Sequence, residues 1–248
     1  MIDTHAHLQG LDGGPGAAIA EAAAAGVARI VCVGDSPELA EGAIALARAH
    51  PGVFATAGLH PHRAELWDDG VRARLDELLA DPAVVAVGEC GLDHYRERAG
   101  REAQAVAFAG QVELAERHGK PLVIHTREAA DDTLAVLRET AAAVVLHCFS
   151  LPEHLDEAVA RGWYCSFAGN VTYPSAADLA AAARSVPAEL LLLETDCPYL
   201  SPVPYRGKPN RPAYVLDTLR FVAGLRGVAP EELAGVVEAN AARAFALP

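Results

Sequence analysis

The sequence lacks several features that would assign it to a special class of protein. Its 248 residues contain no apolar run of about 18 residues, the length that a membrane span needs, and no basic segment followed by an apolar stretch that would indicate a signal peptide. The five cysteines form no C-x-x-C pair and are too few for a disulfide framework. We therefore expect a cytoplasmic protein that contacts no membrane, and the sequence indicates no obligate protein partner.

Basic residues are also scarce. Twenty Lys and Arg stand against 33 Asp and Glu, which gives a formal net charge of −13. A uniformly acidic surface repels polyanions at long range, so any binding of nucleic acid must depend on a local basic patch. The chain has only two lysines, Lys120 and Lys208.

What the sequence does contain is a regular alternation of short apolar runs and longer alanine-rich stretches. With 52% hydrophobic and 21% charged residues, the composition is that of a globular protein. The runs predict eight strands: Ile2 to Leu8, Arg29 to Gly34, Val53 to Leu59, Val84 to Glu89, Leu122 to His125, Val144 to His147, Trp163 to Phe167 and Leu190 to Asp196.

Helix signals separate these runs. Ser36 followed by Pro37 predicts the start of a helix, and Gly119 predicts the end of another. Strands that alternate with helices indicate parallel βαβ units, and eight units fit a length of about 250 residues. We predict an α/β protein, a (β/α)8 TIM barrel, in a single domain over residues 1–248. A doubly wound sheet would use fewer strands and often a Gly-rich loop after the first strand, which is missing here.

Polar side chains follow the carboxyl end of five of the predicted strands. In a barrel these ends converge on one face, where the active sites of this fold are built. His5 and His7 alternate with Ala6, so both imidazoles point to the same side of the first strand and can bind one ion. The candidate metal ligands are His5, His7, Glu89, His125, His147 and Asp196. A single histidine at a strand end is usually not a ligand, but this set suffices for two divalent ions if Glu89 bridges them.

Two further groups of residues border these ligands in the sequence. Asp3 and Glu194 each lie two residues before a ligand, so they are either carboxylates that orient an imidazole or carboxylates with a purely structural role. Cys90, Cys148 and Cys197 each follow a ligand, and strand alternation turns them toward the helices as small apolar residues.

Two loop segments carry candidate substrate contacts. His60 closes the third predicted strand and is either a substrate contact or an ordinary loop histidine, whereas His62 fits the ordinary role better. The proline-rich residues 198–212 predict a long loop with Arg206, Lys208 and Arg211, which is either a solvated run or a phosphate contact.

Taken together, the motifs resemble those of the TatD-type metal-dependent hydrolases, a branch of the amidohydrolase superfamily of TIM barrels. Residues 3–7 are similar to the opening motif of this family, residues 88–93 to its middle motif and residues 194–200 to its late motif. His125 and His147 fall where the family has single histidine ligands.

The resemblance implies a hydrolase that uses two divalent ions, such as Zn, Mn or Mg, and cleaves phosphodiester bonds of DNA. Described members remove nucleotides from single-stranded DNA in the 3′ to 5′ direction. Under this hypothesis His5, His7 and Asp196 hold one ion, and His125 and His147 hold the other. Glu89 bridges the ions, because neither lysine lies where a related branch has a carboxylated lysine.

In the corresponding mechanism a metal-activated water attacks phosphorus. Asp196 is the candidate acceptor of the water proton, and His60 is the candidate contact to a phosphate oxygen or the leaving group. Arg206 and Lys208 would bind the substrate. The same chemistry fits hydrolysis of a C–N or ester bond in a small metabolite, which the acidic net charge favours. A barrel that only stores metal or binds a partner is the non-enzymatic alternative.

Overall fold

The computed structural model describes all residues from 1 to 248. Its eight strands form one sheet in the order β1 to β8. The pairs β1–β2, β3–β4, β4–β5, β5–β6 and β7–β8 are parallel. The strands are β1 (Ile2–Ala6), β2 (Arg29–Cys32), β3 (Val53–Ala57), β4 (Val84–Asp93), β5 (Leu122–Arg127), β6 (Val144–Leu146), β7 (Tyr164–Phe167) and β8 (Leu191–Leu193). All eight strands predicted from the apolar runs are therefore present. β4 continues beyond its prediction, and β8 stops before Glu194.

Helices alternate with the strands, as predicted. They are α1 (Pro15–Ala25), α2 (Pro37–Ala49), α3 (Asp69–Leu79), α4 (Arg101–His118), α5 (Ala130–Leu137), α6 (Leu155–Ala160), α7 (Ala177–Ser185), α8 (Val215–Arg226) and α9 (Pro230–Ala244). The Ser36 side chain accepts a hydrogen bond from the backbone N of Leu39 and caps α2. Gly119 ends α4 with a φ of 60°. None of these helices combines the length and the hydropathy that a membrane-spanning helix requires.

The chain divides into two compact units. One consists of residues 1–32 and 147–248, and the other is the continuous segment 33–146. That the whole chain is a single domain remains a prediction from the sequence.

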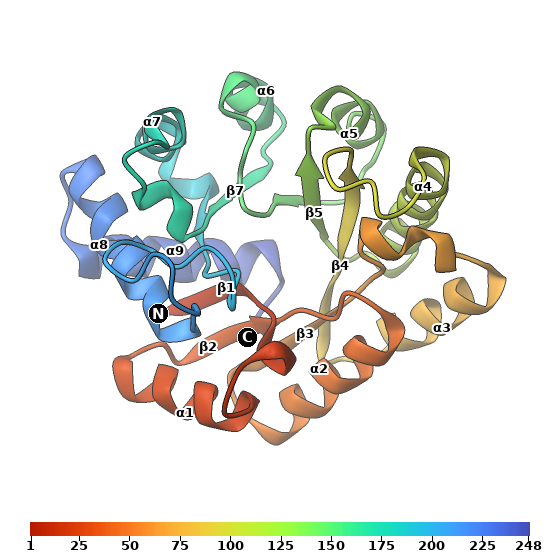
Figure 1. The fold of residues 1–248 in the computed structure, drawn as a ribbon, viewed down its shortest axis with the longest axis horizontal. Helices are drawn as coiled ribbons and strands as arrows, with labels where there is room; N and C mark the ends of the chain where they lie inside the picture. The colour runs from red at the N-terminus through yellow and green to blue at the C-terminus, as the bar shows by residue number, and fades with distance from the viewer. The chain divides into compact units, whose positions relative to one another are not determined.

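The segment 33–146 contains β3 to β6 and helices α2 to α5. In Figure 1 these helices lie on the outer side of the strands that they connect. The register pairs Gly91 of β4 with His125 of β5. A Cβ atom at Gly91, where φ is +135°, would lie 2.0 Å from the backbone oxygen of His125, so only glycine permits this approach. The glycine after Glu89 and Cys90 thus sets how closely β4 and β5 pack.

Two buried glutamines of α4 fix the segments that follow β3 and precede α4. The Gln111 side chain accepts from the backbone N of Leu59 (2.6 Å) and donates to its backbone oxygen (3.0 Å). Gln104 forms the equivalent pair with the backbone of Asp93, at 2.8 and 3.1 Å. Helix α4 therefore determines where the residues next to Leu59 and Asp93 lie.

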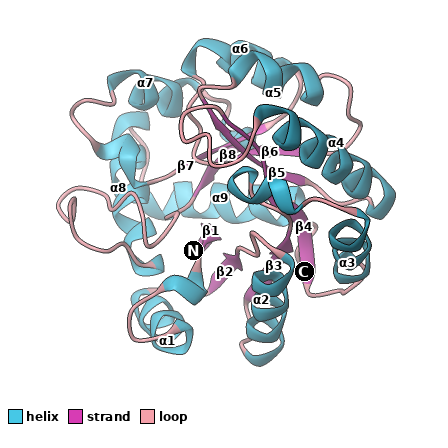
Figure 2. Cartoon of the chain, turned by 45° about the vertical axis from the view of Figure 1, so that its right-hand side comes forward, coloured by secondary structure: helices cyan, strands magenta, loops and turns pink.

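The other unit contains β1, β2, β7, β8, α1 and helices α6 to α9, and Figure 2 shows its strands and helices by type. Its first strand runs beside the segment that follows β8. The backbone N of His7 donates to the oxygen of Cys197, and the N of Asp196 donates to the oxygen of His5, both at 2.9 Å. This pairing brings His5 and His7 next to Asp196 at the carboxyl end of β1.

Candidate metal centre

The first group of candidate ligands lies within the unit formed by residues 1–32 and 147–248. The ligand atoms of His5, His7 and Asp196 all lie within 4.8 Å of one another. Nε2 of His7 is 3.4 Å and Nε2 of His5 is 3.9 Å from Oδ1 of Asp196. The pairing of β1 with the segment after β8 creates this group. Two imidazoles and a carboxylate form a donor set that fits a divalent transition-metal ion.

The Asp196 carboxyl is adapted to carry negative charge. Burial raises its pKa, but the hydrogen bond with His7 and the nearby charges of His147, His7 and His5 outweigh burial and leave the pKa below its usual range. Asp196 is therefore ionised at neutral pH, as a metal ligand must be.

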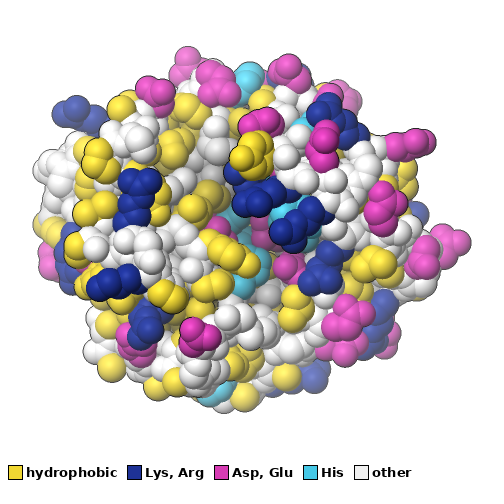
Figure 3. Space-filling model, in the orientation of Figure 1, with side chains coloured by type: hydrophobic (Ala, Val, Ile, Leu, Met, Phe, Trp, Pro, Cys, Tyr) yellow, Lys and Arg dark blue, Asp and Glu magenta, His cyan; other side chains and the backbone are white.

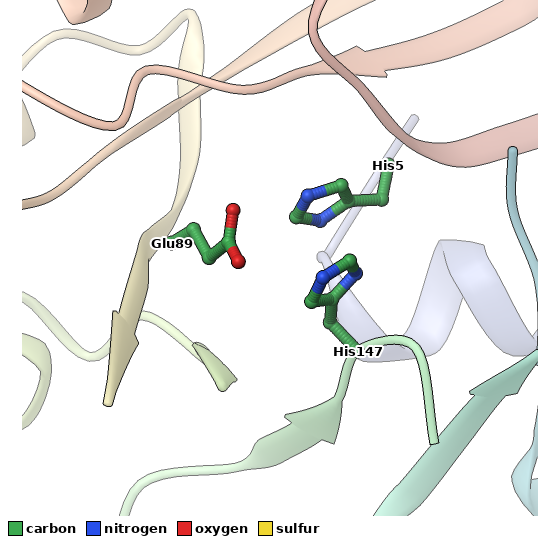
Figure 4. Close-up of side chains that lie close together, drawn as sticks. All are labelled: His5, Glu89 and His147. Carbon is green, nitrogen blue, oxygen red and sulfur yellow. The ribbon is translucent and has the colours of Figure 1, made fainter. Parts of the chain in front are cut away.

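His147 belongs to the same unit and lies against His5. Their ring centroids are 3.6 Å apart. Figure 4 shows the two rings lying face to face. Nδ1 of His147 is 2.8 Å from Oε1 of Glu194. The Glu194 carboxylate also accepts from the backbone N of Cys148 (2.8 Å) and from the hydroxyl of Ser166 (2.5 Å). Glu194 is thus placed to hold the orientation of the His147 ring.

Asp3 has a different environment. Its carboxylate accepts from the backbone N of Thr195 at 2.9 Å, from the Thr195 hydroxyl at 2.5 Å and from the backbone N of His5 at 3.3 Å. Burial raises the pKa of Asp3 to about 8, although these hydrogen bonds act in the opposite direction. Asp3 therefore supports the backbone of β1 and of the segment after β8, whereas Glu194 faces an imidazole.

The second group lies within the segment 33–146. The ligand atoms of His60, Glu89 and His125 lie within 4.8 Å of one another. Nδ1 of His125 is 2.7 Å and Nε2 of His60 is 3.4 Å from Oε1 of Glu89. The Glu89 side chain, which Figure 4 shows leaving β4, is 3% exposed. Buried carboxylates need compensating positive charge, which histidines or a metal ion supply.

The hydrogen bonding of His60 distinguishes it from a ligand. Its Nδ1 accepts from the backbone N of His62 at 3.0 Å. In the neutral ring Nε2 therefore carries the proton and points toward Glu89. A nitrogen that carries a proton donates a hydrogen bond and cannot bind a metal ion. The geometry favours His60 as a hydrogen-bond donor to an oxygen at this site.

Asp93 and His62 also join this group, and neither was predicted to belong to it. Oδ2 of Asp93 is 2.7 Å from Nε2 of His62 and 3.3 Å from Nε2 of His125. Burial alone would raise the pKa of Asp93. Hydrogen bonds from His125, the Arg96 backbone and His62 outweigh burial and hold the pKa well below its usual range. The pKa of His62 is lowered by burial and by the neighbouring His60. The sequence feature that could have indicated Asp93 as a member of this group is its position shortly after Glu89.

The long loop after β8 is present, and its basic residues differ in their contacts. The Arg211 guanidinium forms an ion pair with Glu21 at 2.8 Å. Arg206 lies over the ring of Tyr173, 4.2 Å from its centroid. Lys208 is exposed. Of the three basic residues in this loop, Arg206 and Lys208 are therefore the two whose charge is not taken up by a carboxylate.

All five cysteines are free thiols. Cys90 and Cys197 are fully buried, as strand alternation predicts for small apolar residues. Burial raises the pKa of both thiols, which disfavours the thiolate form that binds metal. Cys148 is only partly buried, and the amide of Asn170 lies 3.9 Å from its sulfur. Its φ of 42° turns the chain out of the regular strand geometry after His147.

Comparison with known proteins agrees with these motifs. The sequence model of a family described as TatD related DNase matches residues 2–246. An uncharacterized metal-dependent hydrolase TatD of Mycobacterium tuberculosis is 41% identical over 100% of this chain and 98% of its own length. A 3'-5' ssDNA/RNA exonuclease TatD of Cronobacter sakazakii is 40% identical over 92% of this chain and 90% of its own length. The crystal structure of YjjV, a TatD homologue of Escherichia coli, superimposes with a TM-score of 0.93 at 30% identity, covering 100% of this chain and 98% of YjjV.

The chain belongs to the TatD family of metal-dependent hydrolases. The strand order, the alternation with helices and the match to YjjV confirm the predicted fold class, a (β/α)8 TIM barrel. Family membership and the two donor groups also support the expected dependence on a metal ion.

Proposed function

We propose that this chain is a cytoplasmic, metal-dependent nuclease that removes nucleotides from the 3′ end of single-stranded DNA. The observation that carries the proposal is the presence of two separate imidazole and carboxylate groups, His5 with His7 and Asp196, and Glu89 with His125. Relatives named as 3'-5' ssDNA/RNA exonucleases support the substrate class. The free cysteines agree with a reducing compartment.

We propose two divalent ions per chain. His5, His7 and Asp196 would hold one ion, His125 and His147 the other, and Glu89 would contact both. In a barrel the carboxyl ends of the strands converge on one face, which supports a single centre. Bound divalent ions supply a water of lowered pKa and polarise a phosphoryl oxygen. The mixed nitrogen and oxygen donors fit Zn or Mn better than an all-oxygen Mg site.

The protein residues then have distinct tasks. Asp196 is ionised at neutral pH, so a carboxylate oxygen is free of a proton and would accept that of the attacking water. The protonated Nε2 of His60 donates to a phosphate oxygen or to the leaving oxygen. Glu194 keeps the His147 ring oriented. Arg206 and Lys208 contribute positive charge that binds substrate phosphates.

The test is release of 3′-terminal nucleotides from labelled single-stranded DNA. Purified protein is stripped with a chelator, and Mn²⁺, Mg²⁺ or Zn²⁺ is then added. Glu89→Gln keeps the size of the side chain and removes its charge, and Glu153→Gln is a matched control at an exposed glutamate. Metal content is measured on the same samples by elemental analysis.

We expect metal-dependent release by the wild type and by Glu153→Gln, and none by Glu89→Gln. Metal content should be about two ions per chain in the wild type and lower in Glu89→Gln, because this variant lacks the proposed bridging carboxylate. Full activity of Glu89→Gln would refute the assignment of this site. If the wild type binds metal but releases no nucleotide, the nuclease proposal is wrong and small amides and esters are the next substrates to assay.

A further inference from the structure

We propose that Tyr95 and Arg127 form a platform on which a base of the single-stranded substrate stacks, with Arg96 contacting an adjacent phosphate. The inference rests on the proposed function, which it deepens by naming a binding subsite. It assigns a role to three exposed residues that lie outside the candidate metal ligands.

The platform is a stacked pair of planar groups. The guanidinium carbon of Arg127 lies 3.9 Å from the centroid of the Tyr95 ring, and that of Arg96 lies 5.8 Å from it. Tyr95 nevertheless remains 53% exposed. A large aromatic side chain with so much accessible surface is available to a ligand, and the guanidinium provides a second planar surface with positive charge.

The platform lies directly beyond one of the candidate ligands. Arg127 follows His125 by two residues on β5, so both side chains leave the same side of the strand, with Arg127 farther out. The register pairs Arg127 with Asp93, the last residue of β4. A nucleotide whose phosphate reaches the His125 group would therefore have its base within reach of the Tyr95 ring.

The backbone that presents Tyr95 and Arg96 is fixed. Their backbone N atoms both donate to Oδ1 of Asp93, at 3.0 and 2.8 Å. Oδ2 of the same carboxylate contacts His62 and His125. One buried carboxylate thus holds both the platform and the imidazoles, which keeps the distance between them constant and reduces the entropy lost on binding.

The charges at the platform are available to a ligand. Neither Arg96 nor Arg127 forms an ion pair with a carboxylate, although other arginines of the segment 33–146 do, such as Arg63 with Asp35 and Arg101 with Glu97. Their positive charge is local, because the chain as a whole has a net charge of −13. Figure 3 shows that basic side chains border histidine side chains on the face in view.

An aromatic ring beside guanidinium groups matches the chemistry of single-stranded nucleic acid. Bases stack on aromatic rings and on the plane of arginine, and phosphates pair with guanidinium groups. Every base has a flat surface, so the platform would accept any sequence. A base in a duplex is already stacked on its neighbours, so the platform would favour single strands over duplex DNA.

The test compares loss of the ring with loss of the base. Binding of a fluorescent oligothymidylate of about eight nucleotides, made with cleavage-resistant phosphorothioate linkages, is measured by anisotropy in the metal-loaded protein. A second set of oligonucleotides carries one abasic site, moved along the strand. The variants are Tyr95→Ala, Tyr95→Phe and Arg96→Met, with Val106→Ala as the control at another exposed apolar side chain.

We expect Tyr95→Ala to weaken binding about five- to thirtyfold, the lower part of the range for loss of one base stack, and Tyr95→Phe and Val106→Ala to bind within about twofold of the wild type. An abasic site at the contacted position should weaken the wild type by a similar factor and leave Tyr95→Ala nearly unchanged, because each change removes the same contact. Arg96→Met should reduce the slope of log K against log salt by about 0.7, the value for one phosphate of a single strand.

The platform is wrong if Tyr95→Ala binds like the wild type, or if the abasic penalty is equal in both proteins. Failure of the nuclease proposal is separate, because it appears as absence of nucleotide release from the metal-loaded wild type. In that case the anisotropy measurements alone decide whether the platform binds a nucleotide. Binding that Tyr95→Ala weakens still supports a nucleotide subsite, and binding that is absent or unaffected by this variant overturns it.

Discussion

Replacing Gln111 by methionine tests how helix α4 positions His60. The Gln111 side chain is the hydrogen-bond partner of both the backbone N and the backbone oxygen of Leu59, the residue that precedes His60. Methionine fills a similar volume and forms neither bond. The variant therefore leaves two buried backbone groups without partners, while creating little empty space.

The expected loss of stability follows from these two groups. An unsatisfied buried donor or acceptor costs about 1–3 kcal/mol, so the free energy of unfolding should fall by about 3 kcal/mol in total. For a chain of this length the melting temperature falls by roughly 2–4 °C per kcal/mol, which gives a decrease of about 6–12 °C. Nucleotide release should also slow, because Leu59 no longer holds the adjacent His60.

Circular dichroism during heating and in urea measures the change. Glu113→Gln is the control on the same helix, where a surface ion pair with Arg72 is lost and the effect should stay below about 1 kcal/mol. A loss below about 1 kcal/mol in Gln111→Met, with an unchanged urea slope, would show that Leu59 finds other partners and would refute the reasoning.

Three further predictions concern packing, pH and thiol reactivity. Gly91→Ala should lower the melting temperature more than Gln111→Met does, because its Cβ would lie 2.0 Å from the backbone oxygen of His125; an unchanged melting temperature would contradict the close approach of β4 and β5. The carboxyl of Asp93 has a pKa below that of the unfolded chain, so its stabilising contribution is complete above about pH 4 and is lost as the pH falls further. The difference in unfolding free energy between the wild type and Asp93→Asn should therefore shrink below about pH 4, and a difference that grows there would show the opposite sign. Four of the five cysteines are buried, and burial raises the pKa of Cys32, for example, to about 12, whereas Cys148 is partly exposed. At pH 8 one thiol should therefore react rapidly with a chromogenic disulfide, and rapid reaction of all five would contradict the burial.

The strands could be predicted because parallel strands in a barrel are covered on both faces and need continuous apolar runs. The same runs located the candidate ligands, since alternation places His5 and His7 on one side of β1. The ends of β4 and β8 were less predictable. Gly91 allows β4 to continue past Glu89 along β5, and the left-handed φ of Asp196 belongs to the irregular segment that follows β8.

Contacts between side chains far apart in the sequence could not be predicted. The sequence predicts the same role for Asp3 and Glu194, because both precede a ligand by two residues. In the structure Glu194 faces His147, whereas Asp3 binds backbone groups. Which of two equivalent carboxylates meets a ring depends on the stagger of neighbouring strands, and spacing along one strand contains no information about stagger.

His62 shows the same limit for a loop. Its sequence neighbours suggest an ordinary surface histidine, and its role depends on Asp93, a residue of another strand. The Tyr95 and Arg127 pair likewise arises only when β4 and β5 are adjacent.

The two donor groups differ in how the chain supplies them, and this sets an order for their formation during synthesis. His60, Glu89 and His125 all lie in the continuous segment 33–146. His5 and His7 emerge first from the ribosome but remain without their carboxylate until Asp196 has been made, near the end of the chain. A nascent chain can therefore assemble the His60, Glu89 and His125 group while the other is still incomplete. The proposed second ion also needs His147, which is made before Asp196, so the amino-terminal histidines are the last to obtain a complete set of donors.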